Sequence, residues 1–233
     1  MCASNQNPQT RFQAVKRRMR GACEVARREI GSVKLLAVSK RQPTSAIRLL
    51  HGLGQRAFGE NYVDEAVEKM EALKDLDIEW HFIGPIQSNK TRLIAEHFDW
   101  AQSIDREKIV RRLAAQRPEA SNPLNVLIQV NLDDEAQKAG CHPKDLPKLA
   151  AAVAAEPRLC LRGLMAIPAP RADGNDQQQV FERLAAMMAE LKIHHPAMDC
   201  LSAGMSADLE AAIAAGSTLV RVGTDLFGPR SDS

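Results

Sequence analysis

Hydrophobic residues follow two spacings along this chain, one typical of helices and one typical of strands. Over residues 9–30, apolar side chains recur every three or four positions between Arg and Lys residues, which predicts an amphipathic helix that stops at Gly31. The stretch "LLAVSK" at 35–40 is instead continuously apolar until its end, which is typical of a buried strand. We expect that strand over residues 33–40, followed by a helix that begins at Pro43.

This succession of strand and helix repeats to the end of the chain. The expected strands lie at residues 56–60, 79–84, 99–104, 125–132, 159–166, 198–204 and 218–223, with helices at 62–75, 89–97, 105–116, 143–155, 176–193 and 207–215. Eight strands with a helix in each interval predict a parallel sheet, and this number of units in 233 residues favours an α/β fold, the (β/α)8 TIM barrel. The alternative is an open doubly wound sheet, which usually carries a G-x-G-x-x-G motif that this sequence lacks. We therefore expect a single domain over residues 1–233, in which an extra N-terminal helix precedes a barrel at 33–228.

Composition argues against several classes of function. Hydrophobic residues make up 45% and charged residues 26%, as in ordinary globular proteins, and a net charge of +2 is too small to favour nucleic acid or an acidic membrane surface as a partner. No apolar run approaches the roughly 18 residues of a membrane span, and the polar N-terminus is unlike a signal peptide. The five cysteines are dispersed without a C-x-x-C pair, so we expect reduced thiols in a cytoplasmic protein and no metal site.

Lys40 is the first candidate for chemistry. In a (β/α)8 barrel the functional residues lie at the carboxyl ends of the strands, and Lys40 ends the first one. Because side chains alternate along a strand, Lys40 shares a face with Leu36 and Val38, and if that face points inward Lys40 lies at the barrel mouth. Partial desolvation there would lower its pKa, and a neutral amine forms a Schiff base with an aldehyde. The alternative is a lysine whose amine simply reaches water.

The last two strand ends carry residues suited to binding phosphate. Gly204, Met205 and Ser206 precede the final predicted helix, so the N–H groups at its start and the Ser206 hydroxyl can donate to an anion. Gly223 and Thr224 offer further donors after the eighth strand, where the phosphate sites of barrels are often built. The alternative for Ser206 is a plain N-cap of the helix.

Arg221 adds a cation at the same end of the barrel. In "LVRVGT" the two valines lie on one face of the strand and Arg221 on the other, so its side chain points into the barrel. A buried guanidinium needs a partner, which is either a barrel carboxylate or the phosphate or ring nitrogen of a ligand. A Schiff-base lysine, a phosphate cradle and an inward arginine together favour a pocket for pyridoxal 5'-phosphate (PLP).

Several other residues have structural explanations that compete with functional ones. His81 is a candidate catalytic residue, but a histidine on a barrel strand is more often a hydrogen-bonded residue of the core. Lys90 and Arg92 either bind an anion or form a solvated helix start. Lys138, in a polar loop, is either a secondary acceptor of the cofactor or an exposed loop lysine.

Five segments, in their order along the chain, carry a resemblance to known proteins. They are "LLAVSK" at 35–40, "FGENYVDEA" at 58–66, "WHFIGPIQSNK" at 80–90, "GLMAIP" at 163–168 and "GMSADLEAAIAAGSTLVRVGTDLFG" at 204–228. From about residue 10 to residue 230, the sequence resembles the pyridoxal-phosphate homeostasis protein family, the single-domain relatives of the N-terminal barrel of alanine racemase. The third segment is highly specific to that family.

The resemblance implies a role for each residue of the pocket. Lys40 would carry PLP as an internal aldimine, Asn61 would lie beside the ring, and Arg221 would face the pyridine nitrogen. The phosphate would be held by Ser206, Gly223 and Thr224, with Met205 beside them. The chain departs from the family after the Schiff-base lysine, where Arg41-Gln42-Pro43 replaces the common Thr-Lys-Pro, and this puts a role for a second lysine there in doubt.

Binding and catalysis are alternative functions of such a pocket. Carbanion chemistry on PLP draws electrons into a protonated ring nitrogen, and a cation such as Arg221 disfavours that protonation. The resemblance implies that alanine racemase takes a second base, a tyrosine, from another domain of its partner subunit, whereas the single tyrosine here is Tyr62. We therefore expect a monomeric PLP-binding protein of intracellular PLP homeostasis without strong catalytic activity, with PLP-dependent apo-enzymes as candidate recipients. The alternatives are a small PLP-dependent amino-acid racemase, with Tyr62 or water as second base, and an aldolase-like barrel that uses Lys40 without the cofactor.

Overall fold

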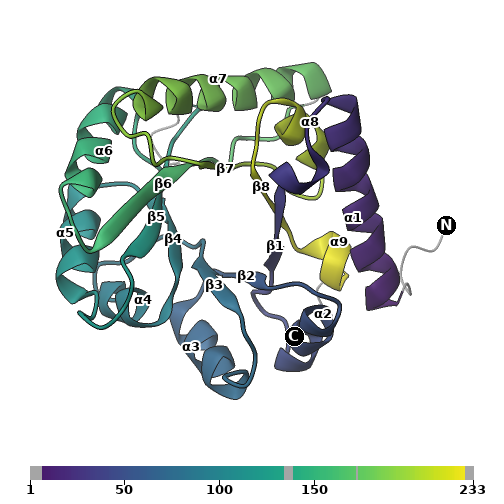
Figure 1. Cartoon of the computed structure of the whole chain (residues 1–233), viewed down its shortest axis with the longest axis horizontal. Helices are drawn as coiled ribbons and strands as arrows, with labels where there is room; N and C mark the ends of the chain where they lie inside the picture. The colour runs from purple at the N-terminus through teal and green to yellow at the C-terminus, as the bar shows by residue number, and fades with distance from the viewer. Residues whose placement is uncertain (1–6, 134–138, 172, 229–233) are drawn as a thin grey trace.

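Eight parallel strands close into a barrel in the computed structural model of the chain, and β8 pairs with β1 to complete the ring (Figure 1). The structure describes residues 7–133, 139–171 and 173–228. The strands are β1 (Lys34–Val38), β2 (Ala57–Glu60), β3 (Glu79–Phe82), β4 (Trp100–Ile104), β5 (Leu124–Gln129), β6 (Leu159–Met165), β7 (Cys200–Ser202) and β8 (Leu219–Val222). The predicted (β/α)8 barrel is confirmed.

Helices surround the strands on the outside of the ring (Figure 1). Those that connect successive strands are α2 (Thr44–Gly52), α3 (Val63–Ala72), α4 (Thr91–His97), α5 (Glu107–Gln116), α6 (Leu146–Ala154), α7 (Gly174–Lys192) and α8 (Leu209–Ala214). The extra N-terminal helix, α1 (Pro8–Val25), lies outside the barrel against α8 and the short α9 (Thr224–Phe227). The carbonyl oxygen of the Asn7 side chain caps α1 by accepting a hydrogen bond from Gln9 N.

Side chains of the strands divide between two hydrophobic layers. Outward-facing residues such as Leu35 and Phe58 pack against the helices in a large core. Inward-facing residues form a smaller cluster inside the barrel, made of Leu36, Ile83, Trp100, Leu127, Met165, Cys200 and Leu219. Val38 packs against this inner cluster, so the predicted inward face of β1 is confirmed.

The N-terminal helix ends earlier than the sequence pattern predicts. It stops at Val25, and Gly31 lies beyond it in a short 3-10 turn (Ile30–Ser32) that leads into β1. Arg27 takes the left-handed conformation at φ 54°, and the N–H groups of Arg27 and Arg28 donate to carbonyl oxygens of the last turn. This is a Schellman ending made without glycine. The Arg28 guanidinium donates to the carbonyl oxygens of Ile213, in α8, and of Ser217, which precedes β8.

The segment after β7 is also less regular than predicted. The expected strand at 198–204 shortens to three residues, and α8 begins at Leu209 instead of residue 207. The intervening chain is a loop, in which Gly204 has φ 91°. A side chain at Gly204 would be strained, and its Cβ would lie only 2.5 Å from Ala212 Cβ. Glycine therefore lets this loop lie close against α8.

Within the described ranges, the cysteines and acidic residues form neither a disulfide nor a metal site. Four cysteines are free thiols, and burial raises the pKa of both Cys141 and Cys200 to about 12, which makes these two poor nucleophiles. The described His, Cys, Asp and Glu residues form no group of three that could hold a metal ion. None of the described helices is both long enough and apolar enough to cross a membrane.

Candidate functional site at the carboxyl end of the barrel

One cavity at the carboxyl ends of the strands brings the predicted site residues together. Its volume is about 280 Å3. It is lined by all seven of them, namely Lys40, Asn61, Met205, Ser206, Arg221, Gly223 and Thr224. Val38, Ile83 and Ile167 add apolar walls. The cavity therefore combines apolar walls with polar groups from four strand ends, which is typical of a small-molecule site.

Behind Lys40 lies a buried ion pair that the sequence analysis did not identify. Lys69, on α3, donates from Nζ to Glu60 Oε1 at 2.9 Å, to Glu65 Oε1 at 2.6 Å and to the Ser39 carbonyl oxygen at 2.8 Å. Glu60 is fully buried, and Ser39 Oγ also donates to it at 2.6 Å. Burial raises the pKa of Glu60, and the nearby ammonium of Lys69 opposes that rise. Lys69 thus fixes the backbone immediately before Lys40.

The turn after Lys40 is held by the same helix. Arg41 takes the left-handed conformation at φ 58°, and its N–H donates to Glu65 Oε1 at 2.6 Å. Gln42 N donates to the Ser39 carbonyl oxygen at 3.0 Å. A turn that is stabilised on both sides of Lys40 points to a fixed lysine backbone. In the sequence, the residues that hold this turn belong to the segment "ENYVDEAVEK". Its charges resemble those of an ordinary solvated helix, so they did not indicate a buried ion pair.

Asn61 presents a polar atom that no described group satisfies. Its side-chain oxygen, Oδ1, is buried and has no hydrogen-bond partner within the described ranges. The Asn61 backbone packs tightly on the end of β3, because a Cβ at Gly84 would lie 2.3 Å from the Asn61 carbonyl oxygen. An unpaired buried oxygen is costly unless a ligand or water satisfies it. Asn61 is therefore positioned to contact a bound molecule.

The loops after β7 and β8 form the predicted cradle of donors. In the part of the chain that the structure describes, the N–H groups of Ser206, Ala207, Gly223 and Thr224 donate to no carbonyl oxygen. The N-cap alternative for Ser206 is wrong, because α8 begins at Leu209 and Asp208 takes the N-cap position. The donors after β7 therefore come from loop backbone rather than from the first turn of α8, and those after β8 lie at the start of α9. Clustered N–H groups of this kind bind anions such as phosphate.

Acidic residues near the cradle are paired, so they oppose an anion less than their charges suggest. Arg18, on α1, donates to the Glu210 carboxylate at 2.7 and 2.8 Å and to Asp225 Oδ2 at 2.6 Å. The same guanidinium donates to the Ser206 carbonyl oxygen at 2.8 Å. Asp208 instead accepts hydrogen bonds from Met205 N and the Gln177 side chain. Arg18 thereby connects the N-terminal helix to both loops of the cradle.

Arg221 is buried without a carboxylate partner among the described residues. Its Nη1 donates to Ser202 O and Oγ at 2.8 and 2.7 Å, and its Nη2 donates to the Ala166 carbonyl oxygen at 2.8 Å. These neutral acceptors use three of the five guanidinium donors, so two donors take no part in these bonds. Burial lowers the pKa of Arg221 to about 10, which still leaves it charged at neutral pH. The predicted inward orientation is confirmed, and the carboxylate alternative is not what the structure shows.

Other predicted residues lie outside this cavity. Tyr62 lines an adjoining cavity with Lys90, and its hydroxyl accepts a hydrogen bond of 3.3 Å from Arg41. Lys90 donates to both oxygens of Asp64 at 2.8 Å, and Arg92 lies 3.6 Å from Glu96. Lys138 lies outside the described residues. His81 is a buried, hydrogen-bonded residue, as the structural alternative expects.

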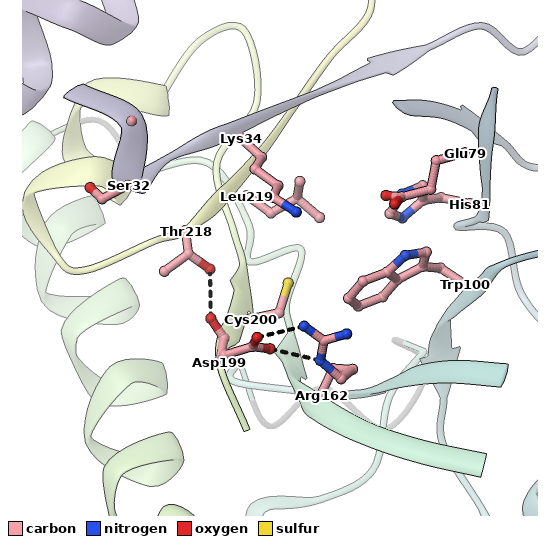
Figure 2. A pocket seen from close by; sticks show the side chains of 11 residues that line it. Ser32, Lys34, Glu79, His81, Trp100, Arg162, Asp199, Cys200, Thr218 and Leu219 are labelled. Carbon is pink, nitrogen blue, oxygen red and sulfur yellow. Dashed lines mark hydrogen bonds and ion pairs between the residues drawn. The ribbon is translucent and has the colours of Figure 1, made fainter. Parts of the chain in front are cut away.

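A second pocket, of about 140 Å3, lies at the amino ends of the strands (Figure 2). Lys34, Glu79, His81 and the Trp100 ring face one another there. On its other side, Arg162 donates to Asp199 Oδ1 at 2.8 Å and lies over the Trp100 ring at 5.0 Å from the centroid. Its charged groups largely pair with one another. Sequence analysis did not identify this pocket, because its lining residues are spread over six strands.

Comparisons with known proteins agree with this architecture. The family model described as alanine racemase, N-terminal domain, matches residues 12–231. A pyridoxal phosphate homeostasis protein of Pseudomonas aeruginosa is 55% identical over 216 residues, which cover 93% of each chain. The protein of the same name from Escherichia coli K12 is 56% identical over 204 residues, 86% of this chain and 87% of its own length.

Solved structures give the same result. PipY of Synechococcus elongatus, solved without PLP, is 36% identical with a TM-score of 0.85, over 95% of this chain and 100% of that one. PipY solved with PLP bound has a TM-score of 0.79, over 92% and 100% of the two chains. Alanine racemase of Corynebacterium glutamicum, at 19% identity and a TM-score of 0.65, shares the fold over 62% of its length. This chain therefore belongs to the family of the alanine racemase N-terminal domain and, within it, to the pyridoxal phosphate homeostasis proteins.

Proposed function

We propose that the chain binds PLP at the carboxyl end of the barrel and takes part in PLP homeostasis. The observation that carries the proposal is one cavity that holds Lys40, a buried Arg221 with spare donors and a cradle of free backbone N–H groups. These groups match an aldehyde, an aromatic nitrogen and a phosphate at three corners of one small molecule. The relatives named for PLP homeostasis and the PLP-bound PipY structure support the same ligand.

Each group of the cavity has a specific task in this proposal. Nζ of Lys40 would bond to the aldehyde carbon of PLP while the aldehyde oxygen leaves as water, so the cofactor is held covalently. The N–H groups of Ser206, Gly223 and Thr224 would hold the phosphate, and Met205 would cover it from the side. Asn61 would contact the ring. When bound, PLP can supply an electron sink for carbanion chemistry.

The same geometry favours binding over catalysis. The charged Arg221 would occupy the place of the proton on the ring nitrogen, which weakens the electron sink. Tyr62, the candidate second base of a racemase, lines the adjoining cavity and bonds to Arg41. We therefore propose a PLP-binding protein without strong catalytic activity, a monomer of the cytoplasm, with PLP-dependent apo-enzymes as candidate recipients.

Absorbance spectroscopy tests this function. Adding PLP to the purified protein should produce the visible band of a lysine-bound cofactor, and Lys40→Ala should abolish it. Lys34→Ala is the matched control, because Lys34 begins the same strand whose end carries Lys40. The proposal is wrong if the wild-type protein never develops the band, or if Lys34→Ala removes it as completely as Lys40→Ala does.

A further inference from the structure

A series of polar side chains runs through the barrel interior, from the mouth to the pocket at the amino ends of the strands. At the mouth, Arg221 Nη1 donates to Ser202 Oγ at 2.7 Å, and Ser202 Oγ donates to Gln102 Oε1 at 2.7 Å. Gln102 Nε2 lies 2.8 Å from Nδ1 of His81. His81 Nε2 lies 2.6 Å from Glu79 Oε1, at the wall of the pocket shown in Figure 2. We name these five residues the axial chain.

The hydrogen bonds of the axial chain all point the same way. An amide nitrogen only donates, so Nδ1 of His81 accepts from Gln102 and its proton lies on Nε2. That N–H donates to the carboxylate of Glu79. The opposite direction would place an unprotonated Nε2 against an acceptor-only carboxylate. Glu79 therefore sets the direction of these hydrogen bonds. Each residue donates to the next one, from the guanidinium of Arg221 to the carboxylate of Glu79.

The surroundings of the axial chain preserve this arrangement. His81, Gln102, Ser202 and Arg221 are each at most 3% exposed, so water cannot replace a missing link easily. Burial lowers the pKa of His81 and keeps the ring neutral, which leaves Nδ1 able to accept. The Trp100 ring stacks on His81 at 5.1 Å between centroids and fixes the imidazole plane. Barrel interiors are usually filled with branched apolar residues, which makes a continuous polar series notable.

We propose that Glu79, His81, Gln102 and Ser202 are positioning residues for Arg221. Because the Ser202 hydroxyl donates to Gln102, its lone pairs remain available to Nη1, and the guanidinium is fixed with two donors left for the mouth. The inference rests on the PLP pocket proposed above only for the identity of the ligand. It implies that a change at Glu79, at the opposite end of the barrel, alters ligand binding at the mouth.

Four variants test the proposal with two measurements. Gln102→Leu interrupts the axial chain, and Glu79→Leu removes its terminal acceptor at a side chain that is 40% exposed. Glu79→Gln keeps an acceptor, and Asp199→Asn alters a carboxylate that lines the same pocket but lies outside the axial chain. The measurements are PLP affinity by absorbance titration and the tautomer of His81 in the PLP-free protein by nitrogen NMR of the imidazole.

Specific results are expected for each variant. Gln102→Leu and Glu79→Leu should weaken PLP binding by roughly three- to tenfold, the size of one hydrogen-bond link. Glu79→Leu should also convert His81 from the Nε2–H tautomer to a mixture, whereas Gln102→Leu should keep Nε2–H, because Glu79 still accepts from it. Glu79→Gln and Asp199→Asn should keep the tautomer and change affinity by less than about twofold, as independent sites do.

Two results would overturn the inference. One is a Glu79→Leu protein whose His81 tautomer and PLP affinity both match the wild type. The other is an Asp199→Asn protein that loses as much affinity as Glu79→Leu, since the effect would then belong to the pocket as a whole. Absence of PLP binding by the wild-type protein would instead contradict the proposed function, and the tautomer measurement would still decide whether the axial chain has its inferred direction.

Discussion

The two ends of the barrel each carry an arginine, and the two arginines lie in opposite electrostatic settings. Lys34 begins β1 and Lys40 follows its end, while Arg162 and Arg221 reach the amino-end pocket and the mouth respectively. Arg162 is paired with Asp199, and the hydrogen bond between them raises the pKa of Arg162. Arg221 has only neutral acceptors among the described residues, and burial lowers its pKa to about 10. The difference between the two ends lies in the partners of the cations.

This difference distinguishes a binding site from a structural polar cluster. At the amino end, Glu79 bonds to His81 and Arg162 to Asp199, although the buried Ser32 Oγ has no partner within the described ranges. At the mouth, Asn61 Oδ1 and several backbone N–H groups find no partner in the described chain, so stabilisation is left for a ligand to supply. Ion pairs behind the cavity, such as Lys69 with Glu60, hold these unpaired groups in place.

The largest effect, on the free energy of unfolding, is expected from the buried Lys69–Glu60 pair behind the cavity. Lys69→Met leaves the fully buried Glu60 carboxylate without its cation and should lower the free energy of unfolding by about 3–5 kcal/mol. Urea denaturation measures this, with Lys74→Met as control, because Lys74 forms an exposed pair with Glu71 and should show no measurable change. Adding Glu60→Gln to Lys69→Met should recover much of the loss. Equal midpoints for the Lys69 and Lys74 variants would show that the buried pair does not support the mouth.

A direct test of the comparison exchanges the two arginines for methionine. Arg221→Met should weaken PLP binding by roughly 10- to 100-fold, because a charged hydrogen-bond donor to the ligand is lost. Arg162→Met should leave affinity within about twofold while lowering the thermal midpoint, since its partners belong to the protein. Titration of both variants with PLP makes the measurement. The distinction between the two ends fails if Arg162→Met loses as much affinity as Arg221→Met.

A smaller effect is expected from pH at the amino end. Burial lowers the folded-state pKa of His81 below its ordinary value of 6.5, so the unfolded chain binds a proton more readily. The stability that neutral His81 contributes is present above pH 6.5 and is lost as pH falls below it. His81→Gln should therefore flatten the change in urea midpoint between about pH 7.5 and pH 5.5. An unchanged dependence of the urea midpoint on pH would show that a group other than His81 causes it.

The smallest effect is expected at the outer support of the cradle. Arg18→Met removes the partner of Glu210 and Asp225, so their charges oppose a bound phosphate. Because these pairs are partly exposed, we expect a loss of PLP affinity of about two- to fivefold. Arg48→Met is the control, since Arg48, on α2, forms a similar two-bond pair with Asp75. Equal PLP affinities of the Arg18 and Arg48 variants would show that Arg18, and with it α1, does not support the cradle.

Sequence periodicity was sufficient for the barrel and for the inward face of Arg221, whereas the choice of Asn61 as a site residue rested on the family resemblance. Alternation along "LVRVGT" placed Arg221 inside, because in a closed barrel every strand has one inward face. The support behind the mouth was not predictable in the same way. Lys69 looks like a solvated helix residue until α3 packs over Glu60, and Gln102 and Ser202 meet across the barrel although they are 100 residues apart. Such contacts depend on strand register, which local pattern does not determine.

We propose that Lys40, at the carboxyl end of β1, binds the cofactor covalently and that Lys34, at the amino end of the same strand, does not. Borohydride reduction of the PLP-loaded protein makes the lysine bond permanent, and proteolysis with mass spectrometry then locates the label. We expect the label on the peptide that contains Lys40. A label that lies chiefly on Lys34 or Lys90, or that is distributed evenly over the lysines, would contradict it.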